Sequence, residues 1–278
     1  MNKFCLLFLA LMICSCSANR DWEHTDPELV VEGWIEAGKA PIVMVSTSAT
    51  PSNEFKTLEQ LQDHIVKWGK VSVSNSDTTV ILFGTIDKNY YPPYIFTTGW
   101  ISGEAGKEYT LDVEYEGMHA SAITTVTAPE PLSGLSATPV EGSDSLFTLV
   151  ATLANKSSDM KFYKIFTMVE GKNSVFVPSF PGSIDGKTLA DNASVTITQG
   201  RSIDQRKFSV HFVRGDIVHV RFCTMDEQSW RFWSDFDDLT SLGDSPIFPL
   251  YKNPATNIIG GLGYWAGYGS TYYTIEIK

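Results

Sequence analysis

The sequence has few cysteines and few basic residues, and it lacks long hydrophobic runs. It holds 4 cysteines in 278 residues, and 21 Lys and Arg face 32 Asp and Glu, giving a formal net charge of −11. A chain this acidic repels phosphate backbones, so nucleic acid is not expected as a partner. No apolar run reaches the roughly 20 residues of a transmembrane helix. Hydrophobic residues still make up 43% of the chain, which predicts a packed core.

Motifs of common enzymes are also missing from the sequence. Neither a G-x-S-x-G elbow nor an H-E-x-x-H zinc helix occurs. Gly261-Leu-Gly263-Tyr-Trp-Ala266 matches the dinucleotide fingerprint, but the helix and acidic residue that this motif needs do not follow it. We therefore expect no catalytic residue, no cofactor and no metal site.

The N-terminal residues 1–15 predict a signal peptide. Lys3 precedes an apolar run, Phe4–Ile13, of about ten residues, which is too short to cross a bilayer. Ile13-Cys14-Ser15-Cys16 then resembles a bacterial lipobox with Cys16 as the residue that receives the lipid. Cys14 is an alternative, but it would place Ile13 at the position before the cut, where a small side chain is preferred. An ordinary secretory signal is the other interpretation.

Residues 16–27 form a short acidic tether after this cysteine. Such tethers resemble the export signals of surface lipoproteins in Bacteroidetes, although a plain linker has the same composition. We expect a lipid-anchored protein of the outer membrane at the cell surface, with the periplasmic face as the alternative. Once Cys5, Cys14 and Cys16 are accounted for, only Cys223 remains, so no intrachain disulfide is expected. Its apolar neighbours predict an inert, partly buried thiol.

Short runs of Val, Ile, Thr and Tyr between turn residues predict a mainly β fold with one or two short helices. We expect two antiparallel β domains, an immunoglobulin-like sandwich over 28–128 and a larger β domain over 146–278. Residues 129–145 hold three prolines and are expected to link them. The clearest strands are Leu29–Ile35, Pro41–Ser46, Val71–Ser74, Val80–Phe83, Glu108–Tyr115, Leu146–Leu153, Phe162–Val169 and Val195–Thr198.

Two helices and one hairpin are predicted from local patterns. Thr57 and Gly69 bound a segment with helical spacing of apolar residues, and Asp226 can cap a helix near 227–240. Asp235, Asp237 and Asp238 lack calcium-loop spacing, so we expect them on the solvated face of that helix. Residues 207–223 predict a hairpin that turns at Arg214-Gly-Asp216.

That hairpin would place His211 opposite His219. The two imidazoles could chelate a metal, but no third ligand is evident, so a solvated or partly buried pair is the preferred interpretation.

The segment Asn257–Tyr273 is the main candidate for ligand or partner contact, with Trp265 and Tyr268 as the contact residues. Five rings lie within ten residues here, between glycines. Because alternate positions of a strand face opposite sides, an inward Tyr264 would turn Trp265 outward as a flat platform. The alternative is that another sheet and the predicted helix cover both faces, so that Trp265 is core.

Two tripeptides resemble acceptor sites for O-glycans in Bacteroidetes. They are Asp77-Thr78-Thr79 and Asp144-Ser145-Leu146, with Thr78 and Ser145 as the acceptors. Both are expected in exposed loops, where a glycosyltransferase could reach them. A chance occurrence is the alternative.

Four blocks make the chain similar to a Bacteroidetes lipoprotein family known as domain of unknown function 4249. They are Val30-Val-Glu-Gly-Trp-Ile35, Gly103–Val113, Gly215–Val220 and Asn257–Gly267. The resemblance implies a two-part β protein anchored in the outer membrane, and the genes of such proteins often accompany those of TonB-dependent transporters. The family has no settled activity, so it assigns no catalytic residue.

Three functions remain in view. The first is a non-enzymatic binding or accessory lipoprotein that helps a TonB-dependent transporter to capture peptide or glycan, as the expected anchor and the missing catalytic motifs suggest. The second is a surface hydrolase with an unrecognised site, which a pair of carboxylates or a Ser–His pair in one pocket would favour. The third is a structural or adhesive surface protein.

Overall fold

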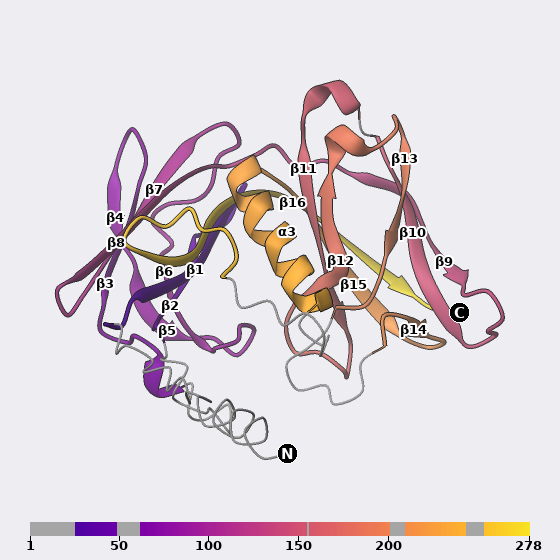
Figure 1. Cartoon of the computed structure of the whole chain (residues 1–278), viewed down its shortest axis with the longest axis horizontal. Coiled ribbons are helices and arrows are strands. Elements are labelled where there is room, and N and C mark those ends of the chain that lie inside the picture. The colour runs from indigo at the N-terminus through magenta and orange to yellow at the C-terminus, as the bar shows by residue number, and fades with distance from the viewer. Residues whose placement is uncertain (1–25, 49–61, 155, 201–208, 243–252) are drawn as a thin grey trace, which may run out of the picture.

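The computed structural model describes residues 26–48, 62–154, 156–200, 209–242 and 253–278, and the described part is mainly β (Figure 1). Its strands are β1 (Leu29–Glu36), β2 (Ile42–Thr47), β3 (Lys70–Ser74), β4 (Thr79–Ile81), β5 (Phe83–Ile86), β6 (Tyr94–Thr97), β7 (Glu108–Tyr115), β8 (Met118–Thr125), β9 (Leu132–Pro139), β10 (Leu146–Leu153), β11 (Phe162–Val169), β12 (Val177–Asp185), β13 (Ala193–Ile197), β14 (Phe212–Val213), β15 (Ile217–Met225) and β16 (Gly261–Glu276). The helices are η1 (Gln62–His64), η2 (Ser157–Asp159), η3 (Gly186–Thr188) and α3 (Glu227–Leu242).

The strands form one sheet of eight and two smaller sheets of four. The large sheet has the order β12-β11-β15-β16-β1-β2-β6-β5, so it contains strands from both ends of the chain. One small sheet has the order β4-β3-β7-β8, and in the other β10 pairs with β9, β13 and β14. We call β1–β8 the N-terminal lobe and β9–β15 the C-terminal lobe, which lie at the left and right of Figure 1.

The long strand β16 joins the two lobes. Its first half pairs in parallel with β1, from Leu29↔Gly261 to Glu36↔Tyr268. Its second half pairs antiparallel with β15, from Thr224↔Gly269 to Ile217↔Glu276. Both lobes therefore share one continuous sheet, although each has a hydrophobic core of its own.

The period-2 alternation of these strands sends their side chains to two different layers. On β16, Trp265 enters the core of the N-terminal lobe, whereas Tyr273 and Ile275 pack against that of the C-terminal lobe. The even-numbered residues Tyr264 and Tyr268 point to the opposite face, toward α3. The two small sheets thus cover one face of the large sheet, and α3 lies on the other.

Helix α3 begins where the sequence predicts. Asp226 caps it, since its Oδ1 accepts a hydrogen bond from the backbone N–H of Ser229 at 2.8 Å. The prediction of a solvated acidic face is wrong for Asp237, which is buried. Its carboxylate pairs with the buried ammonium of Lys164 at 2.8 Å and accepts a backbone hydrogen bond from Ser183, because this face of α3 lies against β11 and β12.

The predicted hairpin over 207–223 is wrong. Gly215 does turn the chain with φ of +88°, but the short strand β14 that precedes it pairs with β10 rather than with β15. Strand β15 pairs instead with β11 and β16. The alternating pattern identified a buried face but not the neighbouring strand. Residues 201–208 lie outside the described residues.

The helix expected between Thr57 and Gly69 is not formed in its described part. Only the single turn η1 is helical, Ile65 bridges to Ser46, and Trp68 is 91% exposed. The two described residues of the predicted apolar face, Ile65 and Trp68, therefore do not share a buried face. Residues 49–61, which include Thr57, lie outside the described residues.

The proline-rich segment 129–145 is not simply a linker, because it contains β9. Two of its prolines, Pro129 and Pro131, precede the strand, and Pro139 is its last residue. Among the described strands, β9 pairs only with β10, and an edge strand tolerates proline at its ends, where no ladder hydrogen bond is lost.

Candidate functional site

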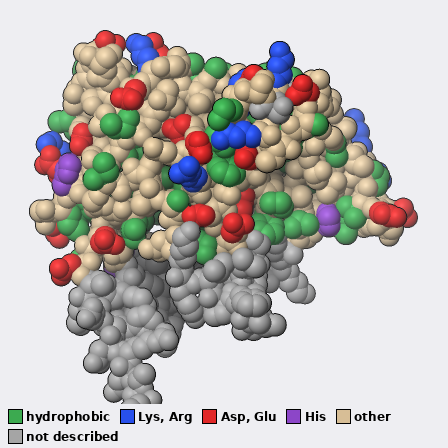
Figure 2. Space-filling view, turned by 45° about the horizontal axis from the view of Figure 1, so that its top comes forward, with side chains coloured by type: hydrophobic (Ala, Val, Ile, Leu, Met, Phe, Trp, Pro, Cys, Tyr) green, Lys and Arg blue, Asp and Glu red, His purple; other side chains and the backbone are tan. Residues whose placement is uncertain are grey.

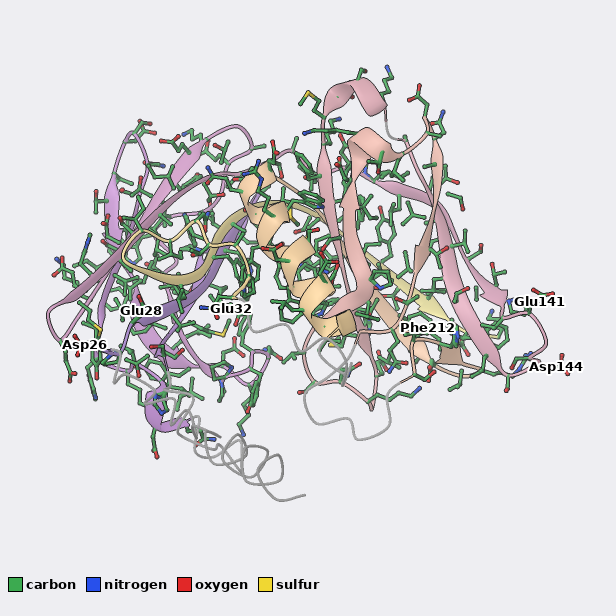
Figure 3. The ribbon with its side chains drawn as sticks, in the orientation of Figure 1. Asp26, Glu28, Glu32, Glu141, Asp144 and Phe212 are labelled. Atoms are coloured by element: carbon green, nitrogen blue, oxygen red, sulfur yellow. The ribbon has the colours of Figure 1, made fainter. Side chains whose placement is uncertain are left out.

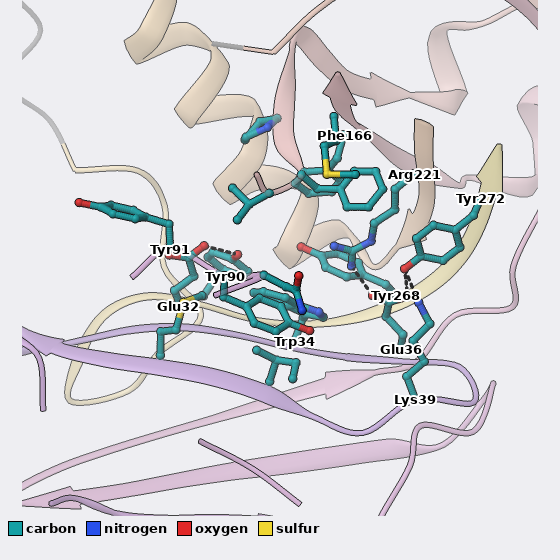
Figure 4. A pocket seen from close by; sticks show the side chains of 18 of the residues that line it. Glu32, Trp34, Glu36, Lys39, Tyr90, Tyr91, Phe166, Arg221, Tyr268 and Tyr272 are labelled. Carbon is teal, nitrogen blue, oxygen red and sulfur yellow. Dashed lines mark hydrogen bonds and ion pairs between the residues drawn. The ribbon is translucent and has the colours of Figure 1, made fainter. Parts of the chain in front are cut away.

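A pocket of about 550 Å³ lies on the α3 face of the large sheet, between the two lobes (Figure 4). A cavity of this size fits a small ligand. Strands β1, β2, β11, β12, β15 and β16 contribute lining residues, and α3 and the loops after β1, β5 and β11 complete the walls. It is lined by Glu32, Trp34, Glu36, Lys39, Ala40, Ile42, Met44, Asn89, Tyr90, Tyr91, Phe166, Met168, Ser174, Val175, Phe176, Pro178, Arg221, Trp233, Tyr264, Tyr268 and Tyr272.

Two cations and one carboxylate meet at one end of the pocket, which we call the basic end. Arg221 Nη2 lies 2.7 Å from Glu36 Oε1, and Lys39 Nζ lies 3.1 Å from Glu36 Oε2. The hydroxyl of Tyr272 donates to the same Oε2 at 2.7 Å and accepts a hydrogen bond from Lys39. Burial raises the pKa of Glu36, but the charges of Arg221 and Lys39 outweigh it, so the pKa is lowered overall. Glu36 is therefore ionised at neutral pH.

Arg221 is the central residue of the basic end. It is only 6% exposed, and its guanidinium carbon lies 5.0 to 5.5 Å from the ring centres of Trp34, Phe166 and Tyr268. Despite the ion pair with Glu36, neither Nε nor Nη2 is aligned for a hydrogen bond with any described residue. Glu36 compensates the charge of this guanidinium, and the donors that are not aligned for a hydrogen bond suit a ligand that supplies acceptor oxygens.

The opposite end of the pocket holds Glu32, four residues before Glu36 on β1. The hydroxyl of Tyr264 donates to Glu32 Oε1 at 3.1 Å, and no described Lys or Arg forms an ion pair with Glu32. Burial raises the pKa of Glu32 to about 7, and the hydrogen bond from Tyr264 only partly offsets it. We call this the acidic end.

Aromatic rings line the space between the two ends. Figure 4 shows Trp34 and Tyr90 between Glu32 on one side and Glu36 and Tyr272 on the other. The Trp34 and Tyr90 rings lie 5.9 Å apart, and Phe176 meets Tyr272 edge to face at 6.0 Å. Such walls bind apolar groups by area and by ring contacts.

The two carboxylates of the pocket come from one strand and have different partners. Glu32 and Glu36 lie on the same face of β1, and four residues of the strand separate their Cα atoms by about 13 Å. Glu36 is held in its ion pair with Arg221, whereas Glu32 accepts a hydrogen bond from Tyr264. In the described part of the chain, no three His, Cys, Asp or Glu side chains are grouped to hold a metal.

The structure separates the two predicted contact residues. Tyr268 lines the pocket, and its hydroxyl accepts a hydrogen bond from Trp233 Nε1 at 2.8 Å. Trp265 is fully buried and donates from Nε1 to the carbonyl of Tyr109 at 3.0 Å. It forms no outward platform, because the small sheet β4-β3-β7-β8 covers that face of β16 while α3 covers the other.

The remaining predicted site residues lie away from the pocket or outside the described residues. Thr78 and Ser145 are both exposed. Asp144, next to Ser145, lies at the outer end of the C-terminal lobe, whereas Glu32 lies between the lobes (Figure 3). Modification of either residue stays a prediction. Cys16 and the rest of 1–25 lie outside the described residues.

The two histidines do not form a pair. His219 Nε2 lies 2.9 Å from Glu170 Oε1, and its Nδ1 is 2.9 Å from the hydroxyl of Thr274. His211 lies before β14, and β14 is not the partner of β15, so the two imidazoles are not cross-strand neighbours. Cys223 is fully buried beside Ser270, and burial raises its pKa, as expected of an inert thiol.

Sequence reasoning missed most of the pocket. Glu32, Trp34 and Glu36 alternate with apolar residues in β1, and Arg221 stands in the apolar strand β15. A charged residue inside a strand that is otherwise buried is a usable signal of a site. The signal does not show which strands become neighbours, so it could not have united Arg221 with Glu36.

Acidic and basic side chains are interspersed on the face of the molecule seen in Figure 2. Among the described residues, no helix has the length and apolarity to cross a membrane.

Comparisons with known proteins identify the family of the chain but no activity. No curated protein matches the chain. A family model described as "Domain of unknown function (DUF4249)" matches residues 19–274, which is nearly the whole chain. The chain therefore belongs to the DUF4249 family.

Proposed function

We propose that this protein is a lipid-anchored lipoprotein of the outer membrane, exposed at the cell surface, that binds a small ligand without converting it. In this proposal it serves as an accessory component of a TonB-dependent transporter that takes up peptide or glycan. The observation that carries the proposal is the pocket between the lobes, with its aromatic walls and its buried Arg221, which forms an ion pair with Glu36 but whose Nε and Nη2 are not aligned for a hydrogen bond.

The geometry of the pocket supports binding rather than catalysis. Its charged groups are either held in one ion-pair cluster, as Glu36, Arg221 and Lys39 are, or have no ion-pair partner among the described residues, as is the case for Glu32. A cluster of aromatic rings with a few fixed polar groups is typical of ligand sites. Glu32 and Arg221 lie on strands of the same sheet, β1 and β15, with β16 between them. This sheet would keep the two ends of the pocket at a fixed separation.

The anchor rests on Cys16 of the lipobox-like sequence. Cys16→Ser is expected to yield a soluble or unprocessed form, whereas the unaltered chain partitions into detergent. A Cys16→Ser protein of mature size that still enters the detergent phase would refute the anchor.

The accessory role is tested by purifying the tagged, full-length protein from detergent-extracted membranes and identifying what accompanies it. We expect a TonB-dependent transporter and a bound small molecule by mass spectrometry. Tyr90→Ala, in a loop at the pocket wall, should lose the small molecule but keep the transporter. The exposed Lys107→Met variant, whose residue lies outside the pocket, is the matched control. Absence of both companions from the unaltered protein would refute the proposal.

One observation favours a hydrolase as the second candidate. Burial raises the pKa of Glu32 to about 7, a value suited to a general acid. Incubation of peptides and oligosaccharides with the protein, followed by mass spectrometry, distinguishes the two. Cleavage that disappears in Glu32→Gln would favour the hydrolase, and an unchanged ligand would favour binding.

A further inference from the structure

The two ends of the pocket differ in charge. At the basic end, Lys39 and Arg221 bring two positive charges against the one negative charge of Glu36. At the acidic end, the only hydrogen bond that Glu32 accepts from a described residue comes from a neutral tyrosine hydroxyl. A ligand that fills the pocket and excludes water leaves the basic end with an excess positive charge, and leaves Glu32 protonated or without a counter-ion, unless the ligand carries charge itself.

A neutral ligand does not satisfy this requirement. A neutral sugar supplies no anion to Arg221 and no cation to Glu32, and an acidic sugar serves the basic end alone. A zwitterion with a carboxylate at one end and an ammonium at the other satisfies both. Its apolar middle would lie against Trp34 and Tyr90, which line the space between the two ends.

The distance between the ends sets the length of such a molecule. Glu32 and Glu36 are about 13 Å apart at Cα by the rise of a strand, and their side chains and that of Arg221 extend into the pocket. A peptide chain spans about 3.3 to 3.6 Å per residue, so three residues span about 10 Å. A single amino acid covers only about 3.5 Å of the roughly 13 Å between these two strand positions.

We propose that the pocket binds a short peptide of about three residues with both termini free, its carboxylate on Arg221 and Lys39 and its ammonium on Glu32. This inference rests on the proposed function and assigns its ligand class as peptide rather than glycan. Arg221 Nε and Nη2 would donate to the carboxylate oxygens, in the way that guanidinium groups commonly bind carboxylates.

The test uses the full-length protein in detergent and three libraries of randomised tripeptides: free at both ends, acetylated at the amine, or amidated at the carboxyl. Bound peptides are recovered by gel filtration and identified by mass spectrometry. We expect the free-ended library to be retained and each blocked library to bind at least tenfold more weakly. Equal retention of the three libraries would overturn the proposal.

Two variants assign each terminus to its end. Lys39→Met should weaken the binding of free-ended peptides about tenfold. It should leave the binding of amidated peptides unchanged, since these lack the carboxylate. Glu32→Gln should weaken the binding of free-ended peptides but leave that of acetylated peptides unchanged, since these lack the ammonium. Lys107→Met and Glu104→Gln remove an exposed ion pair outside the pocket and serve as matched controls. Loss of binding for free-ended and blocked peptides alike in either pocket variant would also contradict the assignment.

The pH dependence gives an independent readout. Glu32 must be ionised to hold an ammonium, and a peptide amine has a pKa of about 8, so affinity should be greatest between about pH 7 and pH 8. The other titratable groups lining the pocket are Glu36, Lys39, Tyr90, Tyr91, Arg221, Tyr264, Tyr268 and Tyr272. Burial raises the pKa of Tyr90, Tyr264, Tyr268 and Tyr272 above the ordinary value for tyrosine, away from this range.

Failure of this inference can be told from failure of the proposed function. If cellotriose or another neutral trisaccharide binds and Tyr90→Ala abolishes that binding, the peptide assignment is wrong but the pocket is still a ligand site. If neither peptides nor trisaccharides bind and the native protein carries no small molecule, both are wrong.

Discussion

At the scale of single residues, Glu32 links the pocket to the stability of the fold. Its pKa in the folded protein is about 7, above the ordinary value of 4.5, so the protonated form is the one that the fold favours. The resulting stabilisation is complete below about pH 4.5 and is lost as the pH rises through 7. The difference between the two pKa values corresponds to at most about 3 kcal/mol.

We therefore predict that Glu32→Gln stabilises the protein at pH 8, by up to about 3 kcal/mol, and leaves its stability unchanged at pH 4.5. Urea unfolding at the two pH values measures this. Glu36→Gln is the contrasting variant, because the pKa of Glu36 is lowered and its loss leaves Arg221 unpaired, so it should destabilise at pH 8. A stability gain of Glu32→Gln that is equal at both pH values would contradict the explanation.

Trp265 is the residue whose role the structure changes most. We predict that Trp265→Ala lowers the free energy of unfolding by about 3 to 5 kcal/mol, since the ring fills the N-terminal core. The position of the ring also requires a glycine at residue 33, because a Cβ atom on Gly33 would lie 2.9 Å from Trp265 Cε3. Gly33→Ala should therefore be destabilising as well. A Trp265→Ala protein with an unchanged melting temperature would show that the ring is not a core residue.

At the scale of elements, α3 is held on the sheet by the buried pair of Lys164 and Asp237. Burial lowers the pKa of Lys164 to about 8, although the negative charge of Asp237 raises it in part. We predict that Asp237→Asn costs about 3 to 5 kcal/mol, because it leaves a buried ammonium without its counter-ion. The double variant Lys164→Met/Asp237→Asn should recover part of this loss. Denaturant unfolding provides the comparison.

The neighbouring Asp238 is exposed and provides the matched control. Asp238→Asn should change the free energy of unfolding by less than about 1 kcal/mol. If Asp237→Asn has no greater effect than Asp238→Asn, the pair does not hold the helix.

The individual strands could be predicted from the sequence, but their neighbours could not. The predicted bounds of β7, β10 and β11 agree with the structure at both ends, because alternation and flanking turn residues are local signals. The partner of β15 could not be predicted in this way. Its neighbours β11 and β16 lie about 50 residues away on either side, and the alternation in β15 shows only which face is buried.

The candidate site was harder to predict for the same reason. Arg221 comes to Glu36 only because β16 lies between β15 and β1 in the sheet. The aromatic segment near Tyr268 belongs to a strand that lines the pocket. It did not indicate which face of that strand is open, and so it could not separate Tyr268 from Trp265.

At the scale of the whole molecule, β16 makes the lobes interdependent. Since one strand pairs with β1 and with β15, loss of either lobe exposes half of β16. We predict a single unfolding transition, with equal calorimetric and van't Hoff enthalpies. Hydrogen exchange should give β7 and β10 the same opening free energy, and Trp265→Ala should lower both equally. Two resolved transitions would show that the lobes are independent.

The position of β16 in the chain has a consequence for biosynthesis. It follows every other described strand, yet it occupies the middle of the large sheet. A ribosome releases the chain from its N-terminus, so β1 and β15 lack their common neighbour until β16, the last described strand, has been made. Until then the protein is incompletely folded, with two unpaired strand edges that a chaperone can bind.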